Sequence, residues 1–413
     1  MRRSRRKCGA RGWVVAAATP VPWEVGAEWG VRASPPLSQF PLRIAVVGAG
    51  STGLYLTRLL HRAGQRVTLF ERAARPRTDG CGILLVSAGV EAIAAGGDGR
   101  VSARLLERSQ PVRRFVVRNL RGDTINAAPA EQDPDRQPSL LIDRPAILEA
   151  LLEDLPPELV VGGAELTGWR QSPEGVALDF ADGSHWQGDL LLAADGIHSR
   201  VAPRLVPERH LHYLGDRVWR GVVADDRFCA NGDFYVYARG RGIYVNMFDL
   251  VPDADGRPRT HWGFFHEEPL PPDRDQQRRL LREPIPAEAL AKLHPEAAAL
   301  IAATPPEAVV ANWSFDLDPL PRLVQGRVAL LGDAAHAMSS SQARGMTAGL
   351  EDALVLARAL DGSQADPEAA LLSYERERLP VVHSYQRRSR EVSSRVGRSR
   401  PPRRPAEPAA ASS

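Results

Sequence analysis

The segment RIAVVGAGSTG, residues 43–53, decides the fold of this chain. It begins with a β-branched run typical of a buried strand, and apolar residues at helical spacing follow over residues 54–63. Three glycines fill the turn between strand and helix. Gly48 permits a tight turn, Gly50 lets a phosphate group approach the backbone, and Gly53 lets the helix pack closely on the strand. The pattern predicts a βαβ unit that binds a dinucleotide.

A second strand is predicted at residues 66–70, and it ends in Glu71, which lies 23 residues beyond Gly48. A carboxylate at that position can accept hydrogen bonds from an adenosine ribose, and the helix N-terminus can face a pyrophosphate. Ser51 and Arg72 are added as candidate cofactor contacts. The loop alone does not distinguish FAD from NAD, and a glycine turn without a ligand stays open.

Length and composition set the limits of the remaining chain. At 413 residues it exceeds the usual size of a single hydrophobic core, so two domains are expected. No apolar run approaches the ~20 residues that span a bilayer. Cys8, Cys81 and Cys229 are far apart and form no CxxC pair, which argues against disulfides and a structural zinc site. We therefore expect no metal and a cytoplasmic protein.

Charge is unevenly distributed along the chain. Residues 1–40 carry a net charge of +5 and residues 387–413 a net charge of +6, which leaves −8 on residues 41–386. An acidic body argues against nucleic-acid binding. The basic start resembles a secretion signal in outline, but its apolar stretch is short and is soon followed by Pro20 and Pro22. We expect a disordered N-terminal extension instead.

The rest of the chain reads as further strands and helices. Asp143 is a suitable N-cap for a helix, and turns at residues 122–123 and 182–183 predict two hairpins. Aromatic residues over 211–266 are spaced as in antiparallel strands. The other predicted elements are buried strands at 190–194 and 328–331, a helix at 350–360, and a last helix over 367–398 that is interrupted at Pro380.

These elements predict an α/β fold with a Rossmann-like nucleotide-binding domain, an interleaved β-rich substrate domain and a C-terminal helix. The predicted division is 1–40, disordered basic extension; 41–111, 135–205 and 310–362, nucleotide-binding domain; 112–134 and 206–309, substrate-binding sheet; 363–398, helical segment; and 399–413, disordered tail.

Two further segments carry a resemblance to a known family. LLAADGIHSR, residues 191–200, resembles the Asp-Gly motif of FAD-dependent aromatic hydroxylases, the group A flavoprotein monooxygenases with the p-hydroxybenzoate hydroxylase fold. GRVALLGDAAH, residues 326–336, resembles their Gly-Asp motif. With the glycine loop, the three motifs stand in the family's order and frame most of residues 42–385.

The resemblance implies a role for several residues. Asp333, after Gly332, is expected to bond the ribityl chain of a non-covalent FAD. A helix starting near Gly345 and Met346 is expected to point at the pyrimidine edge of the flavin, where reduced flavin carries negative charge. The remaining residues that match the family's FAD contacts are Asp195, near the pyrophosphate, and Arg144, aimed at the flavin.

The implied activity is that of a monooxygenase. NADH or NADPH would reduce FAD, O₂ would form a C4a-hydroperoxide, and one oxygen atom would hydroxylate or epoxidise an aromatic or polyketide-like small molecule. The protein would be a monomer or homodimer. No catalytic side chain is required; His261 and His266 are weak candidates for a base. The aromatic residues expected to form the substrate pocket are Trp219, Tyr235, Tyr237, Phe248, Trp262 and Phe264.

The segment 338–347 departs from the family pattern. Serine stands where the family has proline, Gln342 where it has glycine, and Thr347 where it has asparagine, whereas residues 343–346 match the variant of phenolic-acid hydroxylases. This loop would lie over the flavin face at which oxygen reacts. Two alternatives therefore stay open: a flavin-dependent reductase or dehydrogenase on the same fold, and an FAD-retaining protein without oxygenase activity.

Overall fold

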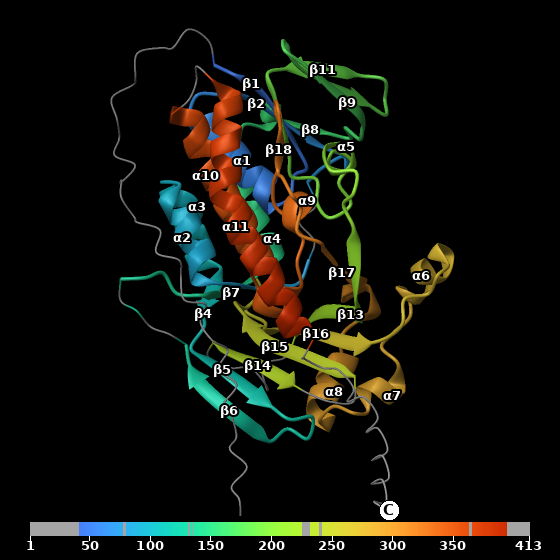
Figure 1. Ribbon diagram of the computed structural model, residues 1–413. Helices are drawn as coiled ribbons and strands as arrows, with labels where there is room; N and C mark the ends of the chain where they lie inside the picture. Colours follow the sequence, from blue (N-terminus) through green and yellow to red (C-terminus); the bar gives the residue numbers. More distant parts are fainter. Residues whose placement is uncertain are drawn as a thin grey trace, which may run out of the picture.

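A computed structural model describes residues 41–76, 80–130, 133, 135–224, 232–238, 242–362 and 366–394. The predicted extension at 1–40 and tail at 399–413 lie outside these residues. The chain forms two main sheets, and a long helix, α11 (Pro367–Ser393), extends from beside the six-stranded sheet toward the seven-stranded one (Figure 1). The mixed α/β architecture agrees with the sequence-based prediction.

The first sheet has six strands and carries the glycine loop. β1 lies at its centre and pairs in parallel with β2 and β12, as the short loops of the predicted βαβ unit require. Its strands in spatial order are β18 (Val324–Gln325), β19 (Val328–Leu330), β12 (Leu190–Ala193), β1 (Arg43–Val47), β2 (Arg66–Glu71) and β8 (Val160–Gly162). β12 and β19 are fully buried, as predicted for parallel strands covered on both faces.

The second sheet has seven strands and collects segments from distant parts of the chain. The predicted hairpin near residues 112–126 forms its edge, and its β5 pairs in parallel with β14. Its strands in spatial order are β17 (Val309–Leu317), β13 (Leu211–Val223), β16 (Arg259–Glu267), β15 (Ile243–Leu250), β14 (Asp233–Ala238), β5 (Arg114–Arg118) and β6 (Thr124–Pro129). Because β17 pairs with β13, residues 310–317 belong to this sheet and not to the nucleotide-binding part to which the sequence assigned them.

The remaining strands form two smaller sheets. One is the second predicted hairpin with its neighbour, β9 (Leu166–Ser172), β10 (Gly175–Phe180) and β11 (His185–Gly188). The other lies between the two large sheets and consists of β3 (Gly82–Leu85), β7 (Leu140–Asp143) and β4 (Ser109–Pro111). It therefore brings the start of β3 close to the seven-stranded sheet.

Helices cover the six-stranded sheet and one end of the other. Asp143 caps α4 as predicted, because its carboxylate accepts the Ala146 N–H at 2.8 Å. The helices are α1 (Ser51–Arg62), α2 (Ser87–Ala95), α3 (Gly99–Glu107), α4 (Arg144–Leu152), α5 (Ala202–Leu205), α6 (Arg274–Leu280), α7 (Ala287–Leu290), α8 (Pro295–Ala302), α9 (Asp333–His336), α10 (Gly345–Gly362) and α11 (Pro367–Ser393). Short 3₁₀ turns occur at Pro157–Leu159, Pro306–Ala308 and Ser340–Gln342.

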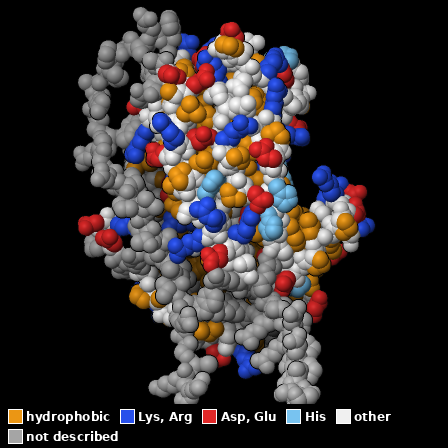
Figure 2. Space-filling view, in the orientation of Figure 1, with side chains coloured by type: hydrophobic (Ala, Val, Ile, Leu, Met, Phe, Trp, Pro, Cys, Tyr) orange, Lys and Arg blue, Asp and Glu red, His pale blue; other side chains and the backbone are white. Residues whose placement is uncertain are grey.

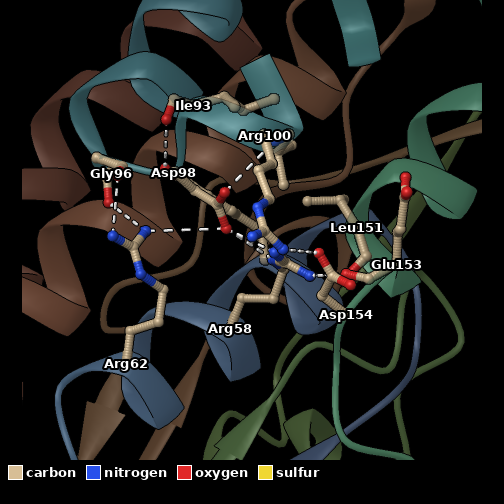
Figure 3. Close-up of polar contacts among 12 residues, drawn as sticks. Arg58, Arg62, Ile93, Gly96, Asp98, Arg100, Leu151, Glu153 and Asp154 are labelled. Atoms are coloured by element: carbon tan, nitrogen blue, oxygen red, sulfur yellow. Dashed lines mark hydrogen bonds and ion pairs between the residues drawn. The ribbon is translucent and has the colours of Figure 1, made fainter. Parts of the chain in front are cut away.

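One buried arginine ties three of these helices together (Figure 3). Arg58 of α1 donates to the carboxylate of Asp98, which caps α3, and to the carbonyl oxygens of Leu151 and Glu153 at the end of α4. The same Asp98 carboxylate lies 3.8 Å from Arg62. These contacts fix α1, α3 and α4 relative to one another.

The last helix differs from the prediction. α11 continues through Pro380 to Ser393 without an interruption, and residues 395–398 lie outside the described part. Proline removes one backbone hydrogen bond, but side chains on both sides of it are anchored. Tyr374 donates to the Leu330 carbonyl oxygen at 2.8 Å, and Gln386 to that of Leu317 at 2.8 Å. These tertiary contacts keep the helix continuous across Pro380.

The face shown in Figure 2 carries acidic and basic side chains interspersed with hydrophobic ones. Within the described residues, no helix is long and apolar enough to cross a membrane. Among the same residues, no group of three or more His, Cys, Asp or Glu side chains could hold a metal ion.

Candidate cofactor and substrate site

The glycine loop has two kinds of glycine. Gly48 has φ +100°, and a Cβ there would collide with the Ala194 carbonyl oxygen, while a Cβ at Gly53 would collide with the Gly48 carbonyl oxygen. Gly50 differs, since its φ of −78° suits any residue and a Cβ there would meet no atom within 4 Å. The fold itself requires Gly48 and Gly53, whereas Gly50 leaves open the space that a ligand would occupy against the backbone.

Glu71 lies at the end of β2, beside this loop. Its carboxylate accepts the N–H of Ala49 at 2.9 Å and the N–H of Ala73 at 3.0 Å. The side chain thus fixes the glycine loop against the end of the sheet. Arg72, the next residue, is exposed, and Ser51 begins α1 half-buried.

Asp195 follows β12 and organises the turn of the Asp-Gly motif. Its carboxylate accepts the Arg200 N–H at 2.7 Å, and its other oxygen is buried with no partner within the described residues. Burial raises the pKa of Asp195, although the hydroxyl of Ser199 and the backbone N–H groups oppose that rise. The side chain is half-buried at the carboxyl end of the parallel strands, the edge where such sheets bind ligands.

The Gly-Asp motif places a carboxylate at the same edge. Gly332 has φ +56° and leads from β19 into α9, which begins at Asp333. Asp333 lies deep in the molecule, yet its side chain is exposed to a cavity that it helps to line. Burial raises its pKa, and His336 and Arg144 oppose that rise. A Cβ on Gly345 would lie 3.8 Å from the Asp333 carboxylate, so the N-terminus of α10 is next to it.

A buried network holds this motif in position. Asp352 of α10 accepts the Gly332 N–H at 3.0 Å, the His336 Nε2–H at 2.5 Å and the Arg378 Nε–H at 2.8 Å. Burial alone would raise the pKa of Asp352, but His336 and Arg378 outweigh it and hold that pKa at about 2. Arg378 also bonds Glu351 at 2.8 Å. These contacts connect α9, α10 and α11 directly behind Asp333.

A cavity of about 430 Å³ lies between the Gly-Asp motif and the seven-stranded sheet. Residues 338–341 form one wall, and strands of the seven-stranded sheet form the opposite wall. The side chains on the sheet side include Asp216, Arg220, Tyr244, Asn246, Phe265, Asn312, Trp313 and Phe315. The cavity thus combines flat aromatic surfaces with a few polar groups, as small-molecule sites do.

The six aromatic residues expected in the substrate pocket do not line this cavity. Five of them belong to a core cluster with residues of α7 and α8: Trp219, Tyr235, Tyr237, Trp262 and Phe264. Phe248 packs in another cluster, 4.6 Å from the His261 ring. Successive side chains of a strand face opposite sides of the sheet, so the cavity receives the sequence neighbours Arg220 and Phe265 instead. Aromatic composition alone does not reveal which face is the ligand face.

The two histidines considered as bases have structural contacts. His261 Nδ1 accepts the Gly82 N–H at 3.1 Å, and burial together with nearby Arg220 lowers its pKa to about 3. His266 lies 3.5 Å from Glu268, and burial lowers its pKa. Neither residue is among those that line the cavity. The described structure does not bring them to the place where a substrate would bind.

Sequence reasoning missed the residues that do line the cavity from the sheet. Arg220 and Asn246 stand within aromatic strands, where a polar residue alternating with apolar ones predicts only a solvent-facing position. Arg220 is a charged residue within the run VWRGVV, residues 218–223, in the middle of a predicted strand. A charge in that position is the signal that could have identified it.

The site fits an FAD molecule. The open space at Gly50 adjoins the N-terminus of α1, a place that suits a pyrophosphate. The exposed carboxylate of Asp333 and the N-terminus of the 18-residue α10 stand at the cavity, where hydroxyl groups and a flavin edge would be held. Arg144, at the start of α4, is close enough to influence the pKa of Asp333.

Comparison with known proteins identifies the fold and its cofactor. Residues 42–389 match a family described as FAD binding domain. The chain belongs to this family. Its relatives include aurachin C monooxygenase/isomerase of Stigmatella aurantiaca and the FAD-dependent urate hydroxylase of Klebsiella pneumoniae. Each is 32% identical over 83% of this chain and 87% of the relative.

Solved structures give the same result. The K. pneumoniae protein HpxO, in complex with FAD and uric acid, matches with a TM-score of 0.72 and 27% identity over 85% of this chain and 87% of that one. A salicylate hydroxylase in a substrate complex matches with a TM-score of 0.68 and 26% identity over 86% and 89% of the two chains. The chain is therefore an FAD-dependent monooxygenase of the aromatic hydroxylase family, and its cofactor is FAD.

Proposed function

We propose that this monooxygenase uses NADH or NADPH and O₂ to hydroxylate a planar aromatic compound held in the 430 Å³ cavity. The observation that carries the proposal is the position of this cavity, which has the Asp333 carboxylate and residues 338–341 on one side and an aromatic sheet on the other. In the balanced reaction, reduced nicotinamide, a proton, O₂ and the ring yield oxidised nicotinamide, water and the hydroxylated ring.

Bound FAD supplies the redox chemistry, and the side chains supply position and exclude water. Asp333 is placed to hold the cofactor's hydroxyl groups, and the Asp352 network keeps Asp333 in place. Glu71 and Gly50 serve the adenosine and pyrophosphate end of the cofactor. Tyr244 and Phe265, whose ring centres are 5.1 Å apart at 66°, offer flat surfaces to the substrate ring.

The decisive experiment measures where oxygen goes. The FAD-loaded protein is incubated with reduced nicotinamide, ¹⁸O₂ and a panel of phenols, hydroxybenzoates and hydroxyquinolines. We expect substrate-dependent oxygen consumption and one ¹⁸O atom per molecule of product. Oxygen consumption that ends entirely as hydrogen peroxide, with every compound, would contradict the proposal.

The same experiment separates the two alternatives. A reductase or dehydrogenase would oxidise the nicotinamide and change the organic compound without incorporating ¹⁸O. A protein that only retains FAD would keep its flavin absorbance when reduced nicotinamide is added. Parallel measurements with NADH and NADPH identify the reductant, and light scattering distinguishes a monomer from a homodimer.

A further inference from the structure

Ala343 has a strained backbone in the loop 338–344, which connects α9 to α10. Its φ is +53° and its ψ is +29°, the left-handed conformation. Within the described residues, Asp154 is the other non-glycine residue with a positive φ, and its short polar side chain tolerates that conformation better than alanine does. For an alanine the conformation is disfavoured about 5- to 30-fold. Contacts elsewhere therefore hold the loop in this shape.

Two side chains attach this loop to α11, one on each side of Ala343. Before it, the Ser341 hydroxyl donates to the Ser389 carbonyl oxygen at 2.7 Å. After it, the Arg344 guanidinium lies over the Tyr385 ring, 5.2 Å from the ring centre. Because Tyr385 and Ser389 are four residues apart on one helix, they lie on the same face of it. The helix thus holds the strained residue between two contacts.

Tyr385 is itself fixed in place beside Arg344. Among the residues that the structure describes, no carboxylate pairs with the Arg344 guanidinium, so the ring is its main contact. Burial raises the pKa of Tyr385, so the hydroxyl stays protonated and donates to Glu351 of α10 at 3.5 Å. Arg378 bonds the other carboxylate oxygen of Glu351 at 2.8 Å. The network behind the Gly-Asp motif therefore holds the hydroxyl end of Tyr385, while the ring face meets Arg344.

The sizes of these effects show that both contacts are needed. A cation over an aromatic ring favours the conformation that makes the contact about 2- to 30-fold, and a hydrogen bond does so about 2- to 10-fold. Each contact alone is no larger than the penalty at Ala343, whereas the two together are large enough to offset it. Loss of either contact should therefore let the loop leave this conformation for part of the time.

The conformation of the loop determines one wall of the cavity. Residues 338–341 line the cavity, and Gly345, the first residue of α10, follows the loop directly. If Ala343 relaxes, the chain changes direction between these two parts, and the serines cannot keep their place on the wall. Water then enters the space where oxygen reacts, and excluding water is part of what the protein contributes to that reaction.

We infer that Tyr385 is a positioning residue, which holds Arg344 over its ring and so keeps the loop 338–344 in the conformation that closes the cavity against water. The inference goes beyond the proposed function, because it concerns a wall of the cavity and not the compound bound inside it. It gives α11 a part in the oxygen reaction, through a residue that contacts neither cofactor nor substrate.

Hydrogen exchange of the FAD-loaded enzyme, without substrate or reductant, tests the inference. The backbone N–H groups of Ser341 and Ala343 bond within the loop and report on its opening. Tyr385→Leu removes the ring beside the guanidinium, so these groups should exchange about 2- to 30-fold faster. Tyr385→Phe retains the ring and should exchange as the wild-type enzyme does.

Arg344→Gln removes the other partner of the same contact. It should raise exchange in the loop as much as Tyr385→Leu does. The double variant should exchange no faster than either single variant, because both substitutions remove one interaction.

Ala343→Gly supplies an independent test, because glycine adopts the left-handed conformation without the penalty. Added to Tyr385→Leu, it should return exchange in the loop to about the wild-type rate. Tyr374→Phe is the matched control on the same helix. It removes a hydrogen bond to the Leu330 carbonyl oxygen and should leave exchange in the loop unchanged. The FAD content of every variant is measured to show that the cofactor is retained.

The oxygen reaction gives the functional readout. With reduced nicotinamide and the compound of the panel that yields the most product, Tyr385→Leu should raise the fraction of consumed oxygen released as hydrogen peroxide. Ala343→Gly in the same chain should lower that fraction again, and Tyr374→Phe should not change it. If no compound yields product, only the proposed function is contradicted, because hydrogen exchange tests the inference without any oxygen chemistry.

The inference is overturned if Tyr385→Leu and Arg344→Gln leave exchange in the loop unchanged. It is also overturned if Tyr385→Phe exchanges as fast as Tyr385→Leu, because the hydroxyl bond to Glu351 is then the contact that matters. Faster exchange along the whole of α11 in Tyr385→Leu, without reversal by Ala343→Gly, would show that the ring only stabilises the helix.

Discussion

Two arginines, one buried and one half-buried on the cavity wall, stand in opposite surroundings in this molecule. Arg378, behind the Gly-Asp motif, bonds Asp352 at 2.8 Å and Glu351 at 2.8 Å, and these carboxylates outweigh burial and raise its pKa. Arg220, on the cavity wall, has an amide oxygen and an aromatic ring as neighbours, and burial lowers its pKa. The chain itself compensates the first charge, whereas the second lacks a partner that a ligand could provide.

Two glycines and two serines show the same difference between a residue with a structural role in the chain and a residue without one. Gly53 is required because a side chain would collide with the backbone, but a side chain at Gly50 would meet only open space. Ser340 and Ser341 both line the cavity, but Ser341 donates to the Ser389 carbonyl oxygen at 2.7 Å, whereas Ser340 is exposed. The contacts within the chain thus give no reason for the glycine at position 50 or the serine at position 340. Both residues lie at the cofactor and substrate site.

The largest effect is expected at Arg378. Arg378→Gln leaves the half-buried carboxylate of Glu351 without its cation and the buried carboxylate of Asp352 with His336 alone, so the free energy of unfolding should fall by about 3–5 kcal/mol. Urea unfolding of the FAD-loaded enzyme measures it. Arg220→Gln is the matched variant and should cost far less stability, or even raise it, since it removes an uncompensated charge. Equal losses in the free energy of unfolding would contradict the proposed difference between Arg378 and Arg220.

The glycine pair tests the same distinction at the cofactor. Gly53→Ala should destabilise the apo-enzyme, because it forces the helix α1 away from the loop. Gly50→Ala should leave the stability of the apo-enzyme unchanged but weaken FAD binding roughly 5- to 150-fold, as expected for overpacking against a ligand. Thermal unfolding of the apo-enzyme and fluorescence titration with FAD separate the two. Unchanged FAD affinity in Gly50→Ala would place the pyrophosphate elsewhere.

These contrasts also show how far the sequence determined the site. The glycine turn, the end of β2 at Glu71 and the helix cap at Asp143 were predictable, because a turn, a strand end and a helix cap follow from residues a few positions apart. The cavity wall was not predictable, because strand alternation fixes that Trp219 and Arg220 face opposite sides but not which side receives the ligand. Only the packing of α7 and α8 on one face, which depends on distant parts of the chain, decides that.

The helix α11 shows the same limit for the fold. Pro380 predicts a break from local rules alone, yet anchored residues before and after it keep the helix continuous. Residues 310–317 were likewise placed in the nucleotide-binding domain, but they belong to β17, whose partner β13 lies about a hundred residues earlier. Tertiary contacts, which no local pattern contains, decide both cases.

The network around Asp352 should also determine how the free energy of unfolding falls at acid pH. The pKa of Asp352 is lowered from 3.8 to about 2 in the folded protein, so its contribution is fully present above pH 3.8 and is lost as the pH falls toward 2. The shift corresponds to about 2 kcal/mol. Unfolding free energies measured between pH 5 and 2 should fall less steeply in Asp352→Asn than in the wild-type enzyme. Parallel curves would show that Asp352 does not carry this dependence.

The smallest effect is expected in residues 338–341, the loop beside the cavity. Here neighbouring serines distinguish an effect on stability from an effect on the oxygen reaction. Ser341→Ala removes the hydrogen bond to the Ser389 carbonyl oxygen and should lower stability by about 1 kcal/mol. Ser340→Ala removes an exposed hydroxyl with no such role, so stability and the rate of flavin reduction should not change. Because Ser340 lines the cavity where the family has proline, its loss should alter how well water is excluded from the oxygen reaction. The fraction of consumed oxygen released as hydrogen peroxide, compared with the yield of hydroxylated product, measures this. If that fraction is unchanged in Ser340→Ala, the surface that Ser340 presents to the cavity does not control the exclusion of water.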